Sequence, residues 1–265
     1  MTEQGDPNAP TGEFADKVVV VTGGASGMGA ATAREFAARG ATLVLVDLNA
    51  DGAERVAGEC RAGGAAEVST RVGDVSQSEF CDAVIDTTVA DHGRIDVLVT
   101  AAGTIHRADS LGTTDGDWAR VMGVNVDGMF FLCRAALRHM TAARSGAIVN
   151  FGSIWGGVGS AGSTAYCVSK GAVHQLTRAL ALDHVEDGIR VNAVAPGEVN
   201  TPMLSSQRDA PPTAEYLQAL ADATIPMKRL AEPEEIARVV VFLASDDASY
   251  ITGEIVHVDA GYTAR

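Results

Sequence analysis

The chain has 265 residues, of which 46% are hydrophobic, and a formal net charge of -14 at neutral pH. It is long enough to bury a large core, and its length suits one extended α/β domain. The acidic balance argues against nucleic acid as a partner, because phosphate binding requires clustered Lys and Arg side chains.

Four cysteines are scattered without a C-x-x-C pair or a His at metal-ligand spacing: Cys60, Cys81, Cys133 and Cys167. This pattern predicts neither a disulfide framework nor a metal site, and it indicates a reducing compartment. The first residues lack the basic and apolar regions of a secretory signal, and no apolar run reaches the ~18 to 20 residues of a membrane span. We therefore expect a cytoplasmic protein with no membrane contact and a flexible tail over residues 1–13.

From residue 17 onward, short apolar runs alternate with longer amphipathic stretches, which is typical of strand-helix units around a parallel sheet. The predicted strands cover residues 17–22, 42–47, 67–72, 97–101, 147–152, 190–194 and 255–258. The predicted helices cover residues 29–39, 51–62, 78–92, 115–141, 163–187 and 233–245. Several strands are continuously apolar, as strands covered on both faces should be. We expect a single doubly wound Rossmann-type α/β domain over residues 14–265, with a seven-stranded parallel sheet and helices on both faces.

Residues 197–230 break this alternation, because four prolines surround a short helical pattern at 214–221: Pro202, Pro211, Pro212 and Pro226. Long loops in compact domains are often lids over a binding site. We expect this segment to close over a substrate.

The first predicted strand runs into a glycine-rich turn, Thr22-Gly23-Gly24-Ala25-Ser26-Gly27-Met28-Gly29, and then into a helix. Glycines at these positions allow a tight turn and a close approach of pyrophosphate to backbone amides, while the helix directs its positive end at the anion. The spacing G-x-x-x-G-x-G differs from the G-x-G-x-x-G of many dinucleotide folds. A glycine-rich turn without a ligand is the alternative interpretation. The contacts expected to a dinucleotide come from Gly23, Ser26, Gly27, Met28 and Gly29.

The second predicted strand ends at Asp47, about twenty residues beyond the turn. A carboxylate there accepts hydrogen bonds from the adenosine ribose of NAD and repels the 2'-phosphate of NADP, and Leu48 and Asn49 supply no compensating cation. Arg71 approaching in three dimensions would weaken this argument. Capping of the next helix is a second interpretation of Asp47, and both can hold. The pattern favours NAD as the cofactor.

Tyr166 and Lys170 lie four residues apart within the helix predicted over 163–187, so their side chains share one face. An ammonium beside a phenol favours the phenolate. We expect Lys170, together with an oxidised nicotinamide, to lower the pKa of Tyr166 from its usual value near ~10 toward neutrality. Tyr166 would then take the proton of an alcohol as hydride leaves the carbon, and it would donate that proton in the reverse direction.

The glycine-rich turn, Asp74-Val75, Tyr166-x-x-x-Lys170 and Pro196-Gly197 together resemble the short-chain dehydrogenase/reductase family, over about residues 14–262. The resemblance implies the strand order 3-2-1-4-5-6-7 and a cofactor at the carboxyl ends of the strands. It also implies a homotetramer joined through the helices at 115–141 and 163–187, whose apolar faces would otherwise belong to the core.

The activity implied by the resemblance is NAD-dependent transfer of a hydride between the nicotinamide and a secondary alcohol or ketone. One alternative is a 3-oxoacyl-thioester reductase, which shares every motif, although that branch generally uses NADPH and Asp47 speaks against it. The other is a dinucleotide-binding regulatory protein without turnover, which the intact Tyr166 and Lys170 argue against. The expected partner is a small-molecule alcohol or carbonyl substrate.

The resemblance also assigns further residues to the site. Ser153 matches a serine that hydrogen-bonds the substrate oxygen, and Asn125 matches an asparagine that links the lysine to solvent through water. A buried structural asparagine is the alternative for Asn125. Trp155 and His106 are candidates for the walls of the substrate pocket, with surface packing as the alternative for the indole. Beyond the turn, the implied cofactor contacts are Asp47, Leu48, Asp74, Val75, Ala102, Gly103, Tyr166, Lys170, Pro196, Gly197, Val199 and Thr201.

Thr100 departs from the family pattern, which usually has an asparagine at this position. One hydroxyl replaces the two polar ends of an amide, so we expect one sheet-stabilising hydrogen bond to be lost or replaced by water. Ser153 with His174 or His184 would suggest a hydrolase, but no G-x-S-x-G turn surrounds the serine.

Overall fold

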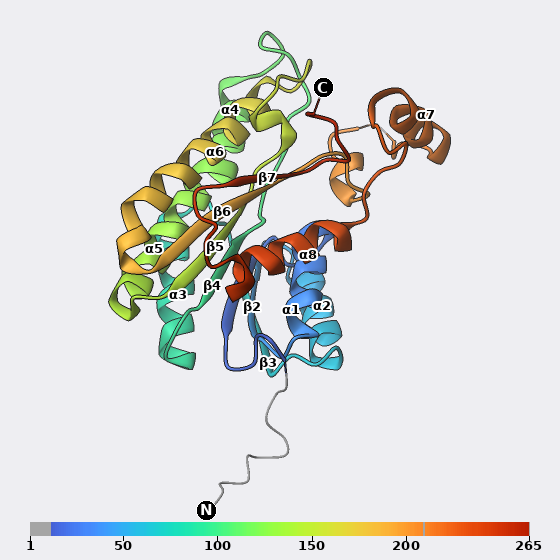
Figure 1. Cartoon of the computed structure of the whole chain (residues 1–265). Helices are drawn as coiled ribbons and strands as arrows, with labels where there is room; N and C mark the ends of the chain where they lie inside the picture. Colours follow the sequence, from blue (N-terminus) through green and yellow to red (C-terminus); the bar gives the residue numbers. More distant parts are fainter. Residues whose placement is uncertain (1–11, 209, 265) are drawn as a thin grey trace, which may run out of the picture.

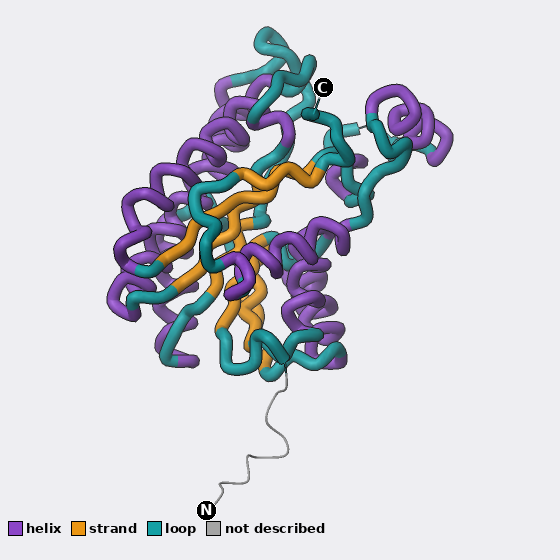
Figure 2. The backbone as a smooth tube through the Cα atoms, viewed as in Figure 1, coloured by secondary structure: helices purple, strands orange, loops and turns teal. Residues whose placement is uncertain are grey.

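The computed structural model describes residues 12–208 and 210–264. Within them lies one seven-stranded parallel sheet in the order β3-β2-β1-β4-β5-β6-β7, which confirms the predicted order. Figure 2 shows the strands between the helices. The strands are β1 (Val18–Thr22), β2 (Thr42–Asp47), β3 (Glu67–Val72), β4 (Val97–Thr100), β5 (Gly146–Phe151), β6 (Ile189–Pro196) and β7 (Ile255–Val258).

Helices cover both faces of the sheet, as expected for a doubly wound fold (Figure 1). The α-helices of the described residues are α1 (Gly27–Ala37), α2 (Ala50–Ala62), α3 (Ser78–His92), α4 (Asp115–Met122), α5 (Gly128–Ala143), α6 (Thr164–His184), α7 (Ala214–Thr224) and α8 (Pro233–Ala244). α1, α2 and α8 lie on one face, and α3, α5 and α6 lie on the other. No helix of this described part of the chain is long and apolar enough to cross a membrane.

The central strand β1 shows why its sequence is continuously apolar. Val19 and Val21 are fully buried in the core beneath α1, α2 and α8, whereas Val20 is fully buried in the core beneath α3, α5 and α6. Successive side chains of a strand point to opposite faces, and here both faces are covered. An alternating polar pattern is therefore absent, and the sheet is held between two cores.

The chain is helical from residue 115 to residue 143, as predicted for 115–141, but not α-helical throughout. α4 ends at Met122, and a π-helical segment, Gly123–Asp127, separates it from α5. One such wide turn shifts the helical phase once without ending the helical pattern, so periodicity does not reveal it. The helix predicted over 163–187 likewise ends its α-helical part at His184 and continues as a short 3₁₀ turn, Val185–Asp187. The π-helical segment matters for function because Asn125 lies within it.

The carboxyl ends of the strands meet at one edge of the sheet, where the predicted site residues gather. Residues 197–230 extend over this edge and contain a 3₁₀ turn, Pro202–Ser205, followed by α7, which stands apart from the main body (Figure 1). At the opposite edge the chain enters the fold through Phe14, whose ring packs edge-on against Phe36 with centroids 4.8 Å apart. The tail expected over residues 1–13 lies outside the described residues except for its last two.

Candidate active site

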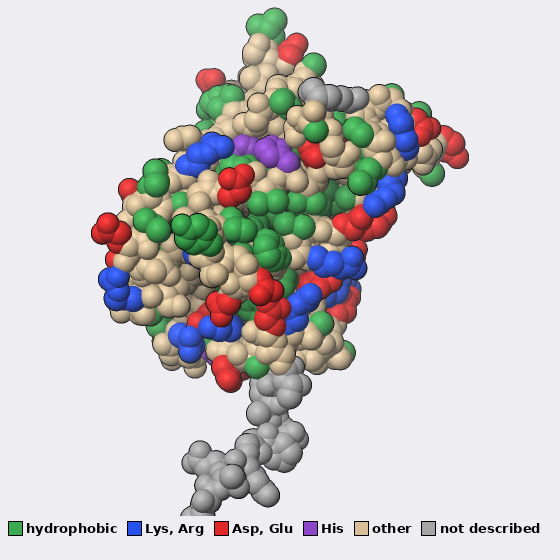
Figure 3. Space-filling model, viewed as in Figure 1, with side chains coloured by type: hydrophobic (Ala, Val, Ile, Leu, Met, Phe, Trp, Pro, Cys, Tyr) green, Lys and Arg blue, Asp and Glu red, His purple; other side chains and the backbone are tan. Residues whose placement is uncertain are grey.

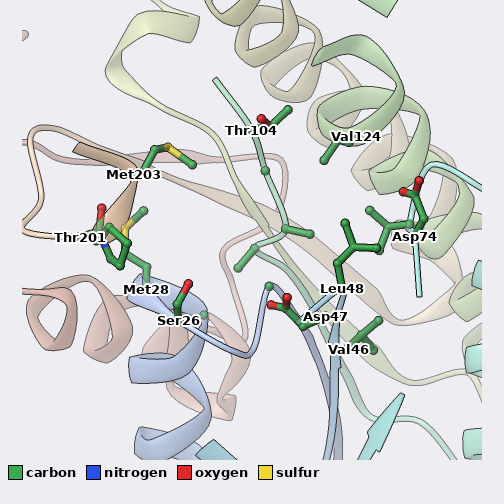
Figure 4. Close-up of a pocket in the computed structure, with 18 of the residues that line it drawn as sticks. Ser26, Met28, Val46, Asp47, Leu48, Asp74, Thr104, Val124, Thr201 and Met203 are labelled. Carbon is green, nitrogen blue, oxygen red and sulfur yellow. The ribbon is translucent and has the colours of Figure 1, made fainter. Parts of the chain in front are cut away.

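A cavity of about 550 Å³ runs along the carboxyl ends of β1, β2 and β4. Figure 4 shows Ser26 and Asp47 close together at the lower wall, with Thr201 and Met203 across from Asp74 and Leu48. Most of the residues expected to contact a dinucleotide line this cavity: Gly23, Ser26, Gly27, Met28, Gly29, Asp47, Leu48, Asp74, Val75, Ala102, Gly103 and Thr201. The structure thus brings together positions that are up to 178 residues apart, from 23 to 201.

The turn between β1 and α1 has no room for side chains at two of its glycines. A Cβ atom on Gly29 would lie 2.2 Å from the carbonyl oxygen of Gly23, and one on Gly23 would lie 2.8 Å from the carbonyl oxygen of Ala101. Gly23 also has a φ angle of +67°, which glycine adopts without strain. α1 begins directly after Ser26, and its first turn contains no acidic residue. The amino end of α1 therefore faces the cavity as a site for an anion such as pyrophosphate.

Asp47 is held at the end of β2 by two backbone amides. Its Oδ2 accepts a hydrogen bond from Ala25 N at 3.0 Å, and its Oδ1 accepts one from Asn49 N at 2.9 Å. Asn49, rather than Asp47, caps α2 by accepting a hydrogen bond from Gly52 N at 3.0 Å, so the helix-capping interpretation of Asp47 is wrong. Arg71 pairs with Asp91 at 2.8 Å and does not line the cavity. Asp47 thus lines the cavity while the Arg71 guanidinium is paired elsewhere, and Arg120 is the one cation among the described lining residues.

A second cavity of about 390 Å³ shares Met28, Thr201 and Met203 with the first. Both Ser153 and Tyr166 line it, as do Pro196, Gly197 and Val199 of the predicted cofactor set. Trp155 is part of its wall, and the indole meets the Tyr166 ring edge-on with centroids 5.9 Å apart. His106 is not part of this wall, because its ring faces Asp117, with Nδ1 3.6 Å from Oδ1, while its neighbours Ile105 and Arg107 line the cavity.

Tyr166, Ser153 and Lys170 are all buried at the junction of β5 and α6. Burial raises the pKa of Tyr166 to about 12, against a hydrogen bond with the Ser153 side chain that lowers it. The lowering expected from Lys170 is therefore not found in the chain by itself, where removal from water is the largest effect. The Lys170 ammonium lies 5.6 Å from the centre of the Tyr166 ring and donates to the carbonyl oxygen of Phe151 at 2.6 Å. Burial lowers the pKa of Lys170 to about 8.

Asn125 uses both ends of its amide inside the protein. Its Oδ1 accepts from Thr104 N at 2.8 Å, and its Nδ2 donates to Thr104 O and to Ser169 Oγ, both at 2.9 Å. The side chain thus joins the loop after β4 to α6, which matches the alternative of a buried structural asparagine. Neither Asn125 nor Lys170 lines a cavity, but Gly103 lies beside both, since a Cβ there would be 3.5 Å from Asn125 Oδ1 and 3.8 Å from Lys170 Nζ.

Thr100 uses its hydroxyl in a hydrogen bond to the neighbouring strand. Thr100 Oγ1 donates to Asn150 Oδ1 at 2.7 Å, Asn150 Nδ2 donates to Thr177 Oγ1 at 3.0 Å, and Thr177 Oγ1 donates to Val173 O at 2.8 Å. All three polar side chains are buried. A network of side-chain hydrogen bonds therefore joins β4, β5 and α6, and the Thr100 hydroxyl contributes one bond to it where an amide could contribute two.

His174, which the sequence suggested only as a partner of Ser153 in a hydrolase, supports the site in another way. Its Nε2 accepts a hydrogen bond from Ser153 N at 3.5 Å, while Ser153 Oγ accepts from Trp155 N at 3.2 Å, so the imidazole holds the serine backbone and does not activate its hydroxyl. The ring fills a space that only glycines leave open, because Cβ atoms on Gly152 and Gly156 would lie 2.4 and 2.6 Å from it. Gly152 and Gly156 are therefore the residues in the sequence that indicate that a side chain packs closely behind Ser153.

The second cavity also contains three charged residues that no motif indicated: Arg107, Glu198 and Arg208. They come from the loop after β4 and from the segment 197–230, and only the folded chain brings them together. Within residues 12–208 and 210–264, no cluster of three potential metal-ligating side chains is present.

A family model described as enoyl-(acyl carrier protein) reductase matches residues 23–263. Cis-4-hydroxycyclohexanecarboxylate dehydrogenase of Sinomonas cyclohexanicum is 44% identical over 95% of this chain and 98% of its own length. Galactitol 2-dehydrogenase (L-tagatose-forming) of Cereibacter sphaeroides is 46% identical over 92% of this chain and 93% of its own length. The crystal structure of levodione reductase superimposes with a TM-score of 0.90 at 36% identity, covering 95% of this chain and 99% of that one. The chain therefore belongs to the short-chain dehydrogenase/reductase family, as its motifs indicated, and is an oxidoreductase of alcohols and carbonyl compounds.

Proposed function

We propose that this chain is an NAD-preferring dehydrogenase that transfers a hydride between the nicotinamide and the carbinol carbon of a secondary alcohol, or the carbonyl carbon of the corresponding ketone. The observation that carries the proposal is the position of Tyr166 and Ser153 in the second cavity, which shares its walls with the groove at the glycine-rich turn. An oxygen-bearing carbon in the second cavity can thus meet a ligand bound in the first.

The residues of the first cavity suit a dinucleotide. The amino end of α1 and the side-chain-free turn at Gly23 and Gly29 would hold the pyrophosphate, and Asp47 would hold the adenosine ribose. A bound nicotinamide supplies the hydride acceptor or donor. The preference for NAD rests on the Asp47 carboxylate, because a 2'-phosphate there would meet a like charge while Arg71 is paired elsewhere.

The proton chemistry belongs to the chain itself. Tyr166 takes the hydroxyl proton of the alcohol, and Ser153 donates a hydrogen bond to the same oxygen as negative charge develops on it. The pKa of Tyr166, which burial raises to about 12, must fall for this step. Positive charge on Lys170 and on an oxidised nicotinamide acts in that direction. Lys170, with a pKa of about 8, changes protonation close to neutral pH and can pass the proton onward.

A ring-shaped secondary alcohol is the substrate shape that the cavity favours. The flat indole of Trp155 stands beside Tyr166 and forms an apolar wall at the reacting position. One relative is named for a hydroxycyclohexane compound and another for a linear polyol, and the secondary hydroxyl is what the two names share. A 3-oxoacyl-thioester reductase and a dinucleotide-binding regulator without turnover are the alternatives that the experiment below separates.

Two further proposals concern movement and assembly. Residues 197–230 would act as a lid. If NADH protects this segment from proteolysis, that result would support the lid.

We also propose a homotetramer, since α5 and α6 expose large apolar side chains at Phe130, Val168 and Leu182. Figure 3 shows a second apolar area between β7 and α8. Light scattering that gives the mass of a monomer would refute the tetramer.

The test is a screen of secondary alcohols and ketones with NAD(H) and NADP(H), followed by the absorbance of the reduced nicotinamide, with Tyr166→Phe in parallel. We expect turnover with NAD(H) that the variant loses while it still binds NADH. A strong preference for NADP(H) would overturn the role given to Asp47 and favour the acyl-thioester reductase. Tight NADH binding without turnover across the panel would favour the regulatory protein.

A further inference from the structure

Two guanidinium groups in the second cavity have no ion-pair partner among the described residues, which do not include Asp209. Arg107 and Arg208 line this cavity with Glu198, its one acidic lining residue among those that the structure describes. Neither arginine has a carboxylate oxygen within 4.0 Å in the described part of the chain. Twelve of the sixteen described arginines have a carboxylate within 4.0 Å, and Arg107 and Arg208 are two of the four that do not.

Backbone contacts orient both guanidinium groups and leave part of each free. Arg107 donates through Nε to Ser206 O at 3.2 Å and through Nη2 to Met203 O at 3.3 Å, which leaves Nη1 without a partner among the described residues. Among the described residues, Arg208 donates only through Nε, to Leu204 O at 2.9 Å, and its guanidinium lies over the Tyr216 ring, 5.7 Å from the ring centre. Open, oriented N-H groups of this kind match the two oxygens of a carboxylate.

The charge balance of the cavity is positive. Burial lowers the pKa of Arg107, and the like charge of Arg208 adds to this effect, so the two cations repel each other across the cavity. Burial raises the pKa of Glu198, whereas Arg107 and Arg208 lower it, and Glu198 is the single acidic lining residue among those described that faces the two cations. Arg107 further lowers the pKa of Tyr166, so the charged end of the cavity lies within electrostatic reach of the reacting end. A bound anion would relieve the repulsion.

We propose that the substrate carries a carboxylate, which Arg107 and Arg208 hold while its secondary hydroxyl reaches Ser153 and Tyr166. This inference rests on the proposed dehydrogenase function and adds the chemical class of the substrate: a hydroxy acid, or the matching oxo acid, whose two functional groups are separated by a body that packs on Trp155. A cavity of about 390 Å³ has the size of a small-molecule site.

Binding tests the anion site without any turnover. Cyclohexanecarboxylate, which has no hydroxyl group, and its neutral analogue cyclohexanecarboxamide are titrated by calorimetry into the full chain, with and without NADH. We expect the carboxylate to bind at least about tenfold more tightly, because charge-assisted hydrogen bonds are the stronger kind. Arg208→Gln should remove most of this difference. Arg238→Gln is the matched control, since it removes the same charge from an exposed position on α8, and it should leave both affinities unchanged.

Equal affinity for the carboxylate and the carboxamide, or an equal loss of both in Arg208→Gln, would overturn the inference. Kinetics with 4-hydroxycyclohexanecarboxylate and cyclohexanol separates it from the proposed function. An enzyme that oxidises cyclohexanol as efficiently as the hydroxy acid keeps the proposed function and refutes the anion site. A protein that binds the carboxylate selectively but oxidises neither alcohol keeps the anion site and refutes the proposed function.

Discussion

Lowering the pH is expected to destabilise the fold through His174, whose imidazole lies behind the site serine. Nε2 accepts the amide hydrogen of Ser153, and the ring is 5% exposed. Protonation would place a second N-H donor against that amide, in a space that Gly152 and Gly156 leave without room to adjust. Burial, together with neighbouring positive groups, lowers the pKa of His174 from 6.5 to about 4.

The direction and size of the effect follow from this difference in pKa. Between pH 6.5 and 4 the unfolded chain binds a proton at His174 that the folded chain does not bind, so the free energy of unfolding falls as the pH falls. The contribution of His174 is complete above pH 6.5 and is lost below pH 4. A difference of about 2.5 pH units at about 1.36 kcal/mol each gives roughly 3 kcal/mol across this window.

Denaturant unfolding of the wild type and His174→Gln at a series of pH values between about 7 and 4 measures this contribution. Glutamine offers a neutral oxygen acceptor to the Ser153 amide and does not titrate. Because both proteins share every carboxylate, the difference between their curves isolates His174. We expect the variant to gain roughly 3 kcal/mol relative to the wild type as the pH falls through the window. Parallel curves would refute the reasoning, since they would show that the folded and unfolded chains protonate His174 alike.

Three further substitutions test the cofactor groove and the sheet. Gly29→Ala places a Cβ atom 2.2 Å from the carbonyl oxygen of Gly23, and we expect a fluorescence titration to show NADH affinity reduced by at least about tenfold with the circular dichroism unchanged. Asp47→Asn removes the charge at the end of β2, and we expect the ratio of kcat/KM for NADP to that for NAD to rise by at least about tenfold. Thr100→Val leaves Asn150 Oδ1 without its hydroxyl donor, and denaturant unfolding should show a loss of about 1–3 kcal/mol with unchanged kinetics. An unchanged value in any of the three assays would contradict the contact it tests.

The parts of the site that depend on local spacing were predictable from the sequence. Tyr166 and Lys170 share a face of α6 because they lie one turn apart, and Asp47 reaches the groove because it ends a buried strand beside the glycine-rich turn. The strand order followed from the family resemblance, and the structure confirms it. The positions of Tyr166, Lys170 and Asp47 each follow from the geometry of a single helix or strand, and the strand order follows from the motifs of the family.

The remaining parts depend on partners far away in the chain. The hydroxyl of Thr100 is satisfied by a residue 50 positions later, and the amide of Ser153 by a histidine 21 positions later on another element. The π-helical segment around Asn125 is set by packing and hydrogen bonds to Thr104 and Ser169, which helical periodicity does not record. The sequence indicates which buried polar groups need hydrogen-bond partners, but only the folded structure shows which residues those partners are.

The two arginines of the second cavity are another case of contacts between distant segments, which local sequence patterns do not predict. Arg107 bonds to backbone carbonyls 96 and 99 positions further along the chain, at Met203 and Ser206 in the proposed lid. Arg208 belongs to the same segment. An anion held by both arginines would therefore add a further link to the connection that Arg107 already makes between the loop after β4 and the proposed lid. The motifs identify a family that shares its hydride chemistry, whereas the proposed choice of a charged substrate would depend on two segments that no motif connects.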